Sequence, residues 1–225
     1  RSSDLKDQAV SIFKPHVDDG APGLVDVLRQ SIDFAYIDMK KREVVIDRRA
    51  IFLSTVSVGH DLRRSSFPNM ANWFADWLAG RLRGTDIEKA LIASRTNAPL
   101  LDKAVQEQWK LVASNSVRAI LPTAVSYAKK TVSRPQAALR HFFLALLTDP
   151  KHRVEIKELG WQLTAKDRDS LSKHLLVHIN AGLEKGEDPG AWKAIVEAIN
   201  AGEVKTPTPP PPPPPPPPST PKETP

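Results

Sequence analysis

The sequence predicts an all-α fold of two repeated helical units, followed by an extended proline-rich tail. Apolar residues recur at three- and four-residue steps through most of residues 1–202, the spacing that places them on one face of a helix. The stretch Val44-Val45-Ile46 is too short to indicate a sheet, and no alternating strand with a hairpin turn accompanies it. Two separate stretches also repeat the same helical pattern in the same order. Together these observations favour a domain of packed helices.

Composition narrows the class of protein. The chain has 225 residues, no cysteine and a formal net charge of +6. The lack of cysteine excludes a disulfide scaffold, a thiolate metal site and a cysteine nucleophile. No apolar run approaches the roughly 20 residues that span a bilayer, so we expect no membrane partner and a cytoplasmic location. Because the chain starts with Arg1 rather than methionine, we expect it to be part of a longer protein.

Three helices are expected in the first half of the domain. Residues 24–35 carry one apolar stripe at helical spacing, and residues 51–59 carry a second that ends at a glycine. Asn69 is expected to cap a third helix that ends near Gly84. The tryptophan and phenylalanine side chains of this third helix are interpreted as core rather than as a stacking surface.

The helix predicted over residues 117–128 repeats the stripe of the first one. It contains Pro122, and an internal proline destabilises a helix by about 3 kcal/mol unless the helix bends. Either Ser116 caps a helix that kinks after its first turn, or a new helix begins at Leu121. The repeat pattern favours the first alternative.

Three further helices complete the domain. Residues 138–147 are strongly apolar and stop before Pro150, because the residue that precedes a proline is driven out of the α region. A capping box at Thr164 opens a helix that extends to about residue 179. An aspartate followed by a proline then begins the helix at 188–200.

An internal repeat relates the two halves of the domain. Residues 24–35 match 117–128 at every buried-type position, and both stretches end in an aromatic residue followed by alanine. The helices that follow share the pattern Arg-x-x-Phe-Leu, which predicts equivalent core positions for Phe52 and Phe143. A difference of two residues falls in the connection, where a change of loop length costs little free energy.

The second copy also resembles a known family. Residues 138–150, Ala-Leu-Arg-His-Phe-Phe-Leu-Ala-Leu-Leu-Thr-Asp-Pro, are similar to the Thr/Ser-Glu-His-Leu-Leu-Leu-Ala-Leu-Leu-x-Asp-Pro signature of the Clp ATPase N-terminal repeat (Clp-R domain). Leu159-Gly160-Trp161 follows at the distance seen in that family. The chain departs from the signature at Arg140, Phe142 and Phe143. The resemblance implies a pseudo-two-fold pair of four-helix repeats, and a domain that recruits substrates or adaptors to a protease or unfoldase.

The chain divides near residue 202. Residues 1–202 are expected to form the helical double-repeat domain, with repeats at about 20–95 and 100–180 and an extra helix at 188–200. The remaining residues, 203–225, hold most of the 21 prolines, ten of them in succession. Proline neither continues a helix nor donates to a sheet, so we expect a disordered polyproline linker. The alternative is a ligand for an SH3- or WW-like groove.

No motif indicates an enzyme, and we expect no catalytic residue, no cofactor and no metal. The P-loop, the Gly-x-Ser-x-Gly elbow and the Gly-x-Gly-x-x-Gly turn are absent from the sequence. His174 and His178 share a helix face, but no third ligand accompanies them. His60 and Asp61 form a triad only if a serine approaches them, which the sequence does not indicate. His141 opens an apolar helix and is interpreted as a hydrogen-bonded core or cap residue.

Two basic clusters are the candidate contact residues for a partner. They are Lys40, Lys41 and Arg42, and Lys129, Lys130 and Arg134. The repeat places the two clusters in equivalent loops. Basic side chains at helix C-termini stabilise the helix dipole, so a structural role competes with binding of an acidic partner. Neither interleaved exposed aromatic residues nor a recognition helix is evident, which makes nucleic acid the less favoured partner.

The sequence therefore predicts a non-enzymatic protein-recognition module. It would bind a protein or peptide, as substrate or adaptor, and recruit it through the polyproline spacer to a separate effector of protease or chaperone type. The missing P-loop places that effector outside this chain. The alternative is a helical domain that binds nucleic acid or another acidic partner through its basic loops.

Overall fold

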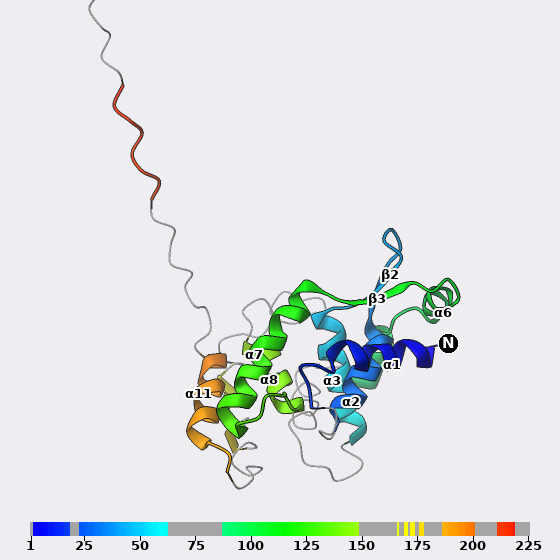
Figure 1. The fold of residues 1–225 in the computed structure, drawn as a ribbon, viewed down its shortest axis with the longest axis horizontal. Helices are drawn as coiled ribbons and strands as arrows, with labels where there is room; N and C mark the ends of the chain where they lie inside the picture. Colours follow the sequence, from blue (N-terminus) through cyan, green and yellow to red (C-terminus); the bar gives the residue numbers. More distant parts are fainter. Residues whose placement is uncertain are drawn as a thin grey trace, which may run out of the picture.

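The computed structural model describes residues 2–18, 23–62, 87–148, 186–200 and 211–218, together with 166, 169–170, 172–173 and 176–177. Helices dominate these residues, as the sequence predicts. In chain order the elements are α1 (Ser2–Phe13), α2 (Leu24–Gln30), the 3-10 helix η1 (Ser31–Phe34), β1 (Tyr36–Asp38), β2 (Glu43–Ile46), α3 (Arg48–Leu62), α5 (Ile87–Ala93), α6 (Ala98–Gln106), β3 (Lys110–Ala113), α7 (Asn115–Val132), α8 (Leu139–Thr148) and α11 (Pro189–Asn200) (Figure 1).

The all-α prediction is wrong in one part, because the described residues include a three-stranded sheet in the order β1-β2-β3. β1 and β2 form an antiparallel hairpin in which Tyr36 lies opposite Val45. β3 comes from much later in the chain and pairs parallel to β2, with Leu111 beside Val44. Each strand is only three or four residues long. Strands this short leave little periodicity in the sequence, and β3 forms only through pairing with a distant segment.

The helix predicted over 117–128 is present but starts earlier. α7 begins after Ser114, whose side-chain oxygen accepts a hydrogen bond from the Val117 N–H at 3.2 Å. The cap is therefore Ser114 rather than the expected Ser116. α7 continues through Pro122, whose side chain is exposed and does not clash with the core.

The two copies of the repeat differ in how their helices are connected. In the first copy, α2 is followed by η1 and then by the β1–β2 hairpin. In the second copy, the matching stretch lies within a single helix of 18 residues, α7. The first copy's second helix, α3, continues past Gly59 to Leu62. Phe52 is buried as predicted, while the side chain of Phe143 lies outside the described part. Superposition of the two copies remains a prediction.

The C-terminal helix follows its sequence signal closely. Asp188 precedes Pro189, and its Oδ1 accepts hydrogen bonds from the N–H groups of Gly190 and Ala191 at 2.9 and 3.3 Å. The described residues between 166 and 177 are helical. The helix predicted over 69–84 lies outside the described residues.

The core joins the N-terminal helix, α1, to α8. Phe13 of α1 and Phe142 of α8 are both fully buried and meet edge to face, with ring centroids 6.2 Å apart and an interplanar angle of 75°. Just after α1, the Asp18 N–H donates to the Ala137 carbonyl at 2.8 Å. The two halves of the sequence therefore share one core.

The described prolines of the tail, 211–218, are extended and exposed, and their trace leads away from the helical body (Figure 1). Polyproline II buries no apolar surface against such a body. Deletion of residues 203–225 should therefore leave the thermal midpoint of unfolding within about 1 °C of the parent. Differential scanning calorimetry of both chains measures this. A fall of several degrees would show that the tail contributes to the fold.

Candidate functional site

The β1–β2 hairpin projects from the helical body and carries the first predicted cluster at its turn (Figure 1). Lys40, Lys41 and Arg42 are all exposed. Met39, next to them in the turn, is 56% exposed, and Tyr36, at the start of β1, is 59% exposed. The hairpin thus presents three cations together with two large apolar side chains outside the core.

The turn of the hairpin is held in a defined conformation. Asp38 Oδ1 accepts hydrogen bonds from the N–H groups of Lys40 and Lys41 at 3.1 and 3.0 Å, which is an Asx-type turn. Arg42 adopts a left-handed backbone conformation with a φ of 53°. A side chain at such a position costs on the order of 1 kcal/mol relative to glycine. An arginine therefore occupies a position where glycine would be the more stable residue.

The outer face of the sheet extends this surface. The strand register places Tyr36, Val45 and Val112 in one row across the three strands, and paired positions share one face of a sheet. Val45 and Val112 are half-buried. The next row toward the turn is charged and consists of Asp38, Glu43 and Lys110. An apolar row, a charged row and a basic turn therefore follow one another on the same face.

The second predicted cluster lies in a different setting. Lys129 and Lys130 belong to the last turn of α7 and not to a loop, so the prediction of equivalent loops is wrong. α7 begins directly after β3, and at 1.5 Å per residue its last turn lies about 20 Å along the helix axis from the sheet. The two lysines stabilise the helix dipole there. Arg134 follows and pairs with Asp18 at 4.0 Å.

The apolar part of this surface was not predicted from the sequence. Tyr36 and Met39 do not belong to any helical stripe, and their exposure follows only from the pairing of β1 with β2. The sequence does contain a weak signal for the hairpin, because Asp38 precedes a polar turn between two short runs of residues with high β-propensity. Neither run is long enough to outweigh the helical pattern around it.

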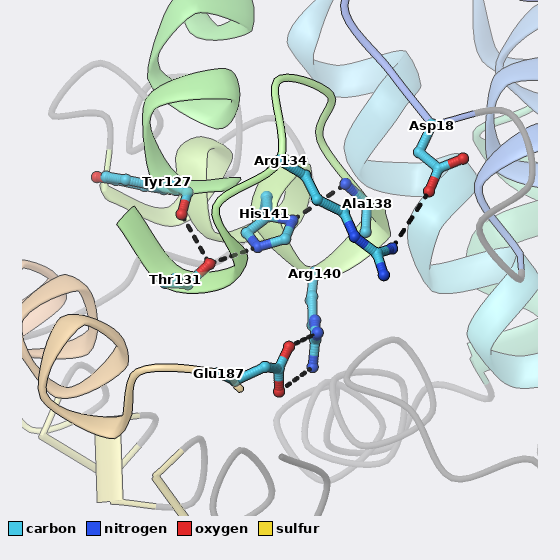
Figure 2. Close-up of polar contacts among 8 residues, drawn as sticks. All are labelled: Asp18, Tyr127, Thr131, Arg134, Ala138, Arg140, His141 and Glu187. Carbon is cyan, nitrogen blue, oxygen red and sulfur yellow. Dashed lines mark hydrogen bonds and ion pairs between the residues drawn. The ribbon is translucent and has the colours of Figure 1, made fainter. Parts of the chain in front are cut away.

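His141 lies in a separate buried cluster at the start of α8 (Figure 2). Its Nδ1 accepts a hydrogen bond from the Ala138 N–H at 3.0 Å, and its Nε2 lies 2.8 Å from Thr131 Oγ1. The Thr131 hydroxyl lies 2.7 Å from the Tyr127 carbonyl and donates its only proton to it, so His141 Nε2 carries the proton and donates to Thr131. Both ring nitrogens of a neutral imidazole are thereby satisfied. The predicted core or cap role of His141 is confirmed.

The surroundings of His141 keep it uncharged. The ring is 1% exposed and stacks on Trp192 of α11 with centroids 5.0 Å apart. Burial, followed by the charges of Arg140 and Arg134, lowers the pKa of His141 to about 3. Arg140 also covers the Trp192 ring at 5.0 Å and forms an ion pair with Glu187. A neutral and fully bonded imidazole joins α8 to α11 and offers no proton for acid–base chemistry near pH 7.

The remaining candidates lie largely outside the described residues. His174 and His178 fall in undescribed positions, as does the side chain of His60. Among the residues that the structure describes, no three histidine or carboxylate side chains gather as metal ligands. No helix in the described ranges has the length and apolar character needed to cross a bilayer.

Comparison with protein-family models, with curated proteins and with solved structures finds no match. The resemblance of residues 138–150 to the Clp N-terminal repeat therefore remains a prediction from the sequence.

Proposed function

We propose that this chain is a non-enzymatic protein-recognition module that binds a partner through the β1–β2 hairpin. The single observation that carries the proposal is the projecting hairpin, which exposes Lys40, Lys41, Arg42 and Met39 at its turn and Tyr36 at the start of β1. Solvated cations speed the encounter with an acidic partner. Aromatic and methionine side chains supply the apolar contacts that hold protein interfaces together.

Two further features support recruitment to a separate effector. The resemblance of residues 138–150 to the Clp N-terminal repeat suggests that the partner is a substrate or adaptor of a protease or unfoldase. The ten consecutive prolines of 209–218 would separate the module from an effector by roughly 30 Å, at about 3.1 Å per residue. The tail would then act as a spacer and not as the binding element.

Charge reversal at the hairpin should abolish partner capture. The test compares Lys40→Glu/Lys41→Glu with the matched control Lys129→Glu/Lys130→Glu, which makes the same change of charge at the end of α7. Immobilised full-length chains are incubated with lysate from the source organism, and bound proteins are quantified by mass spectrometry. We expect the hairpin variant to lose at least about nine-tenths of its specific partner through slower association. The helix variant and a chain ending at residue 202 should retain the partner.

The opposite pattern would contradict the proposal. A partner that requires the polyproline tail and ignores both lysine pairs would identify the tail as the binding element. Thermal melting of each variant verifies that the domain is folded before capture is compared.

A nucleic-acid partner is the second candidate, and the exposure of three cations at the turn of a projecting β-hairpin favours it more than the sequence alone does. Two-stranded β-ribbons can enter a DNA groove. An electrophoretic shift with a 20-base-pair duplex at about 50 and 200 mM salt distinguishes the two. Binding that falls steeply with salt and is lost in Lys40→Glu/Lys41→Glu would support nucleic acid, and no shift at the lower salt would exclude it.

A further inference from the structure

The turn of the β1–β2 hairpin contains an arginine whose backbone conformation disfavours a side chain. Four residues, from Met39 to Arg42, connect the paired residues Asp38 and Glu43. Arg42 is the last of them and has a left-handed φ of 53°. In that conformation Cβ crowds the neighbouring carbonyl oxygen, so glycine is the more stable residue. Residues held in such conformations cluster at functional sites.

The charges of the turn are a second feature that lowers its stability. Within the part of the chain that the structure describes, the side chains of Lys40, Lys41 and Arg42 form no ion pair. Three like charges on successive residues repel one another. Several arginines outside the hairpin have carboxylate partners, which are Asp7 for Arg29, Asp18 for Arg134 and Glu187 for Arg140.

The hairpin itself does not require these side chains. Glycine in place of Arg42 would adopt the same left-handed backbone conformation. The two hydrogen bonds to Asp38 come from the backbone N–H groups of Lys40 and Lys41, so neutral residues there would keep them. Residues that lower stability without serving the fold are typical of positions retained for function. We therefore ask which ligand the three cations fit.

The neighbour of the cations indicates a protein ligand. Met39 begins the same turn and is 56% exposed. Methionine and arginine are both enriched at protein interfaces, whereas lysine is depleted there. Arginine also pairs with a carboxylate through two parallel N–H···O bonds, a geometry that the ammonium group of lysine cannot provide. The turn thus combines an apolar contact, one group suited to two-point recognition of a carboxylate, and two further charges.

We propose that Arg42 anchors an acidic segment of the partner protein, in which an apolar residue accompanies two or more carboxylates. The inference rests on the proposed function of the hairpin and names the chemistry of its partner. The Arg42 guanidinium donates two hydrogen bonds to one carboxylate of the segment. Lys40 and Lys41 speed the encounter through their charge, and Met39 covers the apolar residue of the partner.

The test separates binding from stability by placing glycine at two left-handed positions. Arg42→Gly removes the guanidinium together with the backbone strain. Ser133→Gly is the matched control, because Ser133 follows α7, is exposed and has a φ of 56°. Each substitution should raise the thermal midpoint of unfolding by about 2–4 °C. Only Arg42→Gly should weaken binding, so that the more stable hairpin becomes the less active one.

Binding is measured with peptides selected on the full chain from a phage-displayed library of random dodecapeptides. The enriched sequences should carry at least two aspartate or glutamate residues beside an apolar one. Fluorescence anisotropy of the best synthetic peptide, at about 150 mM salt, gives its affinity for each variant. We expect Arg42→Gly to weaken binding at least about tenfold and Ser133→Gly to change it less than about twofold. Arg42→Lys keeps the charge but should still weaken binding about threefold or more.

Comparison with Lys40→Glu/Lys41→Glu distinguishes a failure of this inference from a failure of the proposed function. Loss of peptide binding in the lysine variant but not in Arg42→Gly would overturn the inference and leave the proposed function in place. Binding that neither variant changes would overturn both. The inference is also overturned if no acidic peptide is enriched, or if Arg42→Gly lowers the thermal midpoint, since Arg42 would then support the turn itself. Tighter binding of the DNA duplex than of the best peptide would assign the turn to phosphates instead.

Discussion

Replacement of Phe142 by alanine should lower the free energy of unfolding by about 3–5 kcal/mol, the range for truncating a buried phenylalanine. Phe142 is fully buried and meets the ring of Phe13 edge to face at 6.2 Å. The substitution removes the contact that joins α1 to α8 and leaves a cavity between them. Urea denaturation followed by circular dichroism measures the loss.

Two controls make this prediction specific. Ile92→Ala truncates an apolar side chain that is 65% exposed and should change the free energy of unfolding by less than about 0.5 kcal/mol. A double-mutant cycle of Phe13→Ala and Phe142→Ala should give a coupling energy of about 0.5–1.5 kcal/mol, the range for edge-to-face pairs. A Phe142→Ala chain that melts within a degree or two of the parent would mean that α8 does not pack in this register.

The second large effect is a dependence of stability on pH that originates at His141. The pKa of this buried ring is lowered to about 3 from the ordinary value of 6.5. Between those two values the unfolded chain binds a proton that the folded chain does not. The contribution of His141 to stability is therefore complete above pH 6.5 and is lost as the pH falls toward 3. The loss amounts to up to about 1.4 kcal/mol per pH unit.

A His141→Gln variant isolates this effect. Glutamine at the third position of a helix can accept from the backbone N–H at the cap, as His141 does from Ala138, and its amide can donate to Thr131. It does not titrate, while the carboxylates of the two chains are identical. Between pH 7 and 5 the free energy of unfolding should fall more steeply for the parent than for the variant. Parallel profiles would show that His141 protonates normally in the folded protein.

Helices with strong local signals could be predicted from the sequence. α8 and α11 lie where the apolar stripes and the Asp188-Pro189 start place them, because capping and i, i+4 packing act between near neighbours. The core or cap role of His141 follows from its place at the start of an apolar helix. α1, α5 and α6 were not predicted, although α6 has a local start signal: Asn97 caps it and Pro99 lies in its first turn.

The candidate site was predicted only in part. Lys40, Lys41 and Arg42 were identified from charge alone, and their exposure is confirmed. Their supposed counterparts Lys129 and Lys130 prove to be helix-end residues, because α7 continues four residues beyond the predicted end of its stripe. The exposed apolar residues Tyr36 and Met39 were not predicted, since they belong to the first strand and the turn of a hairpin that the sequence did not indicate.

The sequence by itself determined the helical character of the chain and the apolar faces of its main helices, because each depends on residues close together along the backbone. Only the tertiary structure decided the sheet and the projecting hairpin. β2 and β3 are short and lie far apart in the chain, so their pairing is stabilised by contacts that form only when the core assembles. The same assembly stacks His141 on Trp192 of α11, a contact that no local pattern specifies.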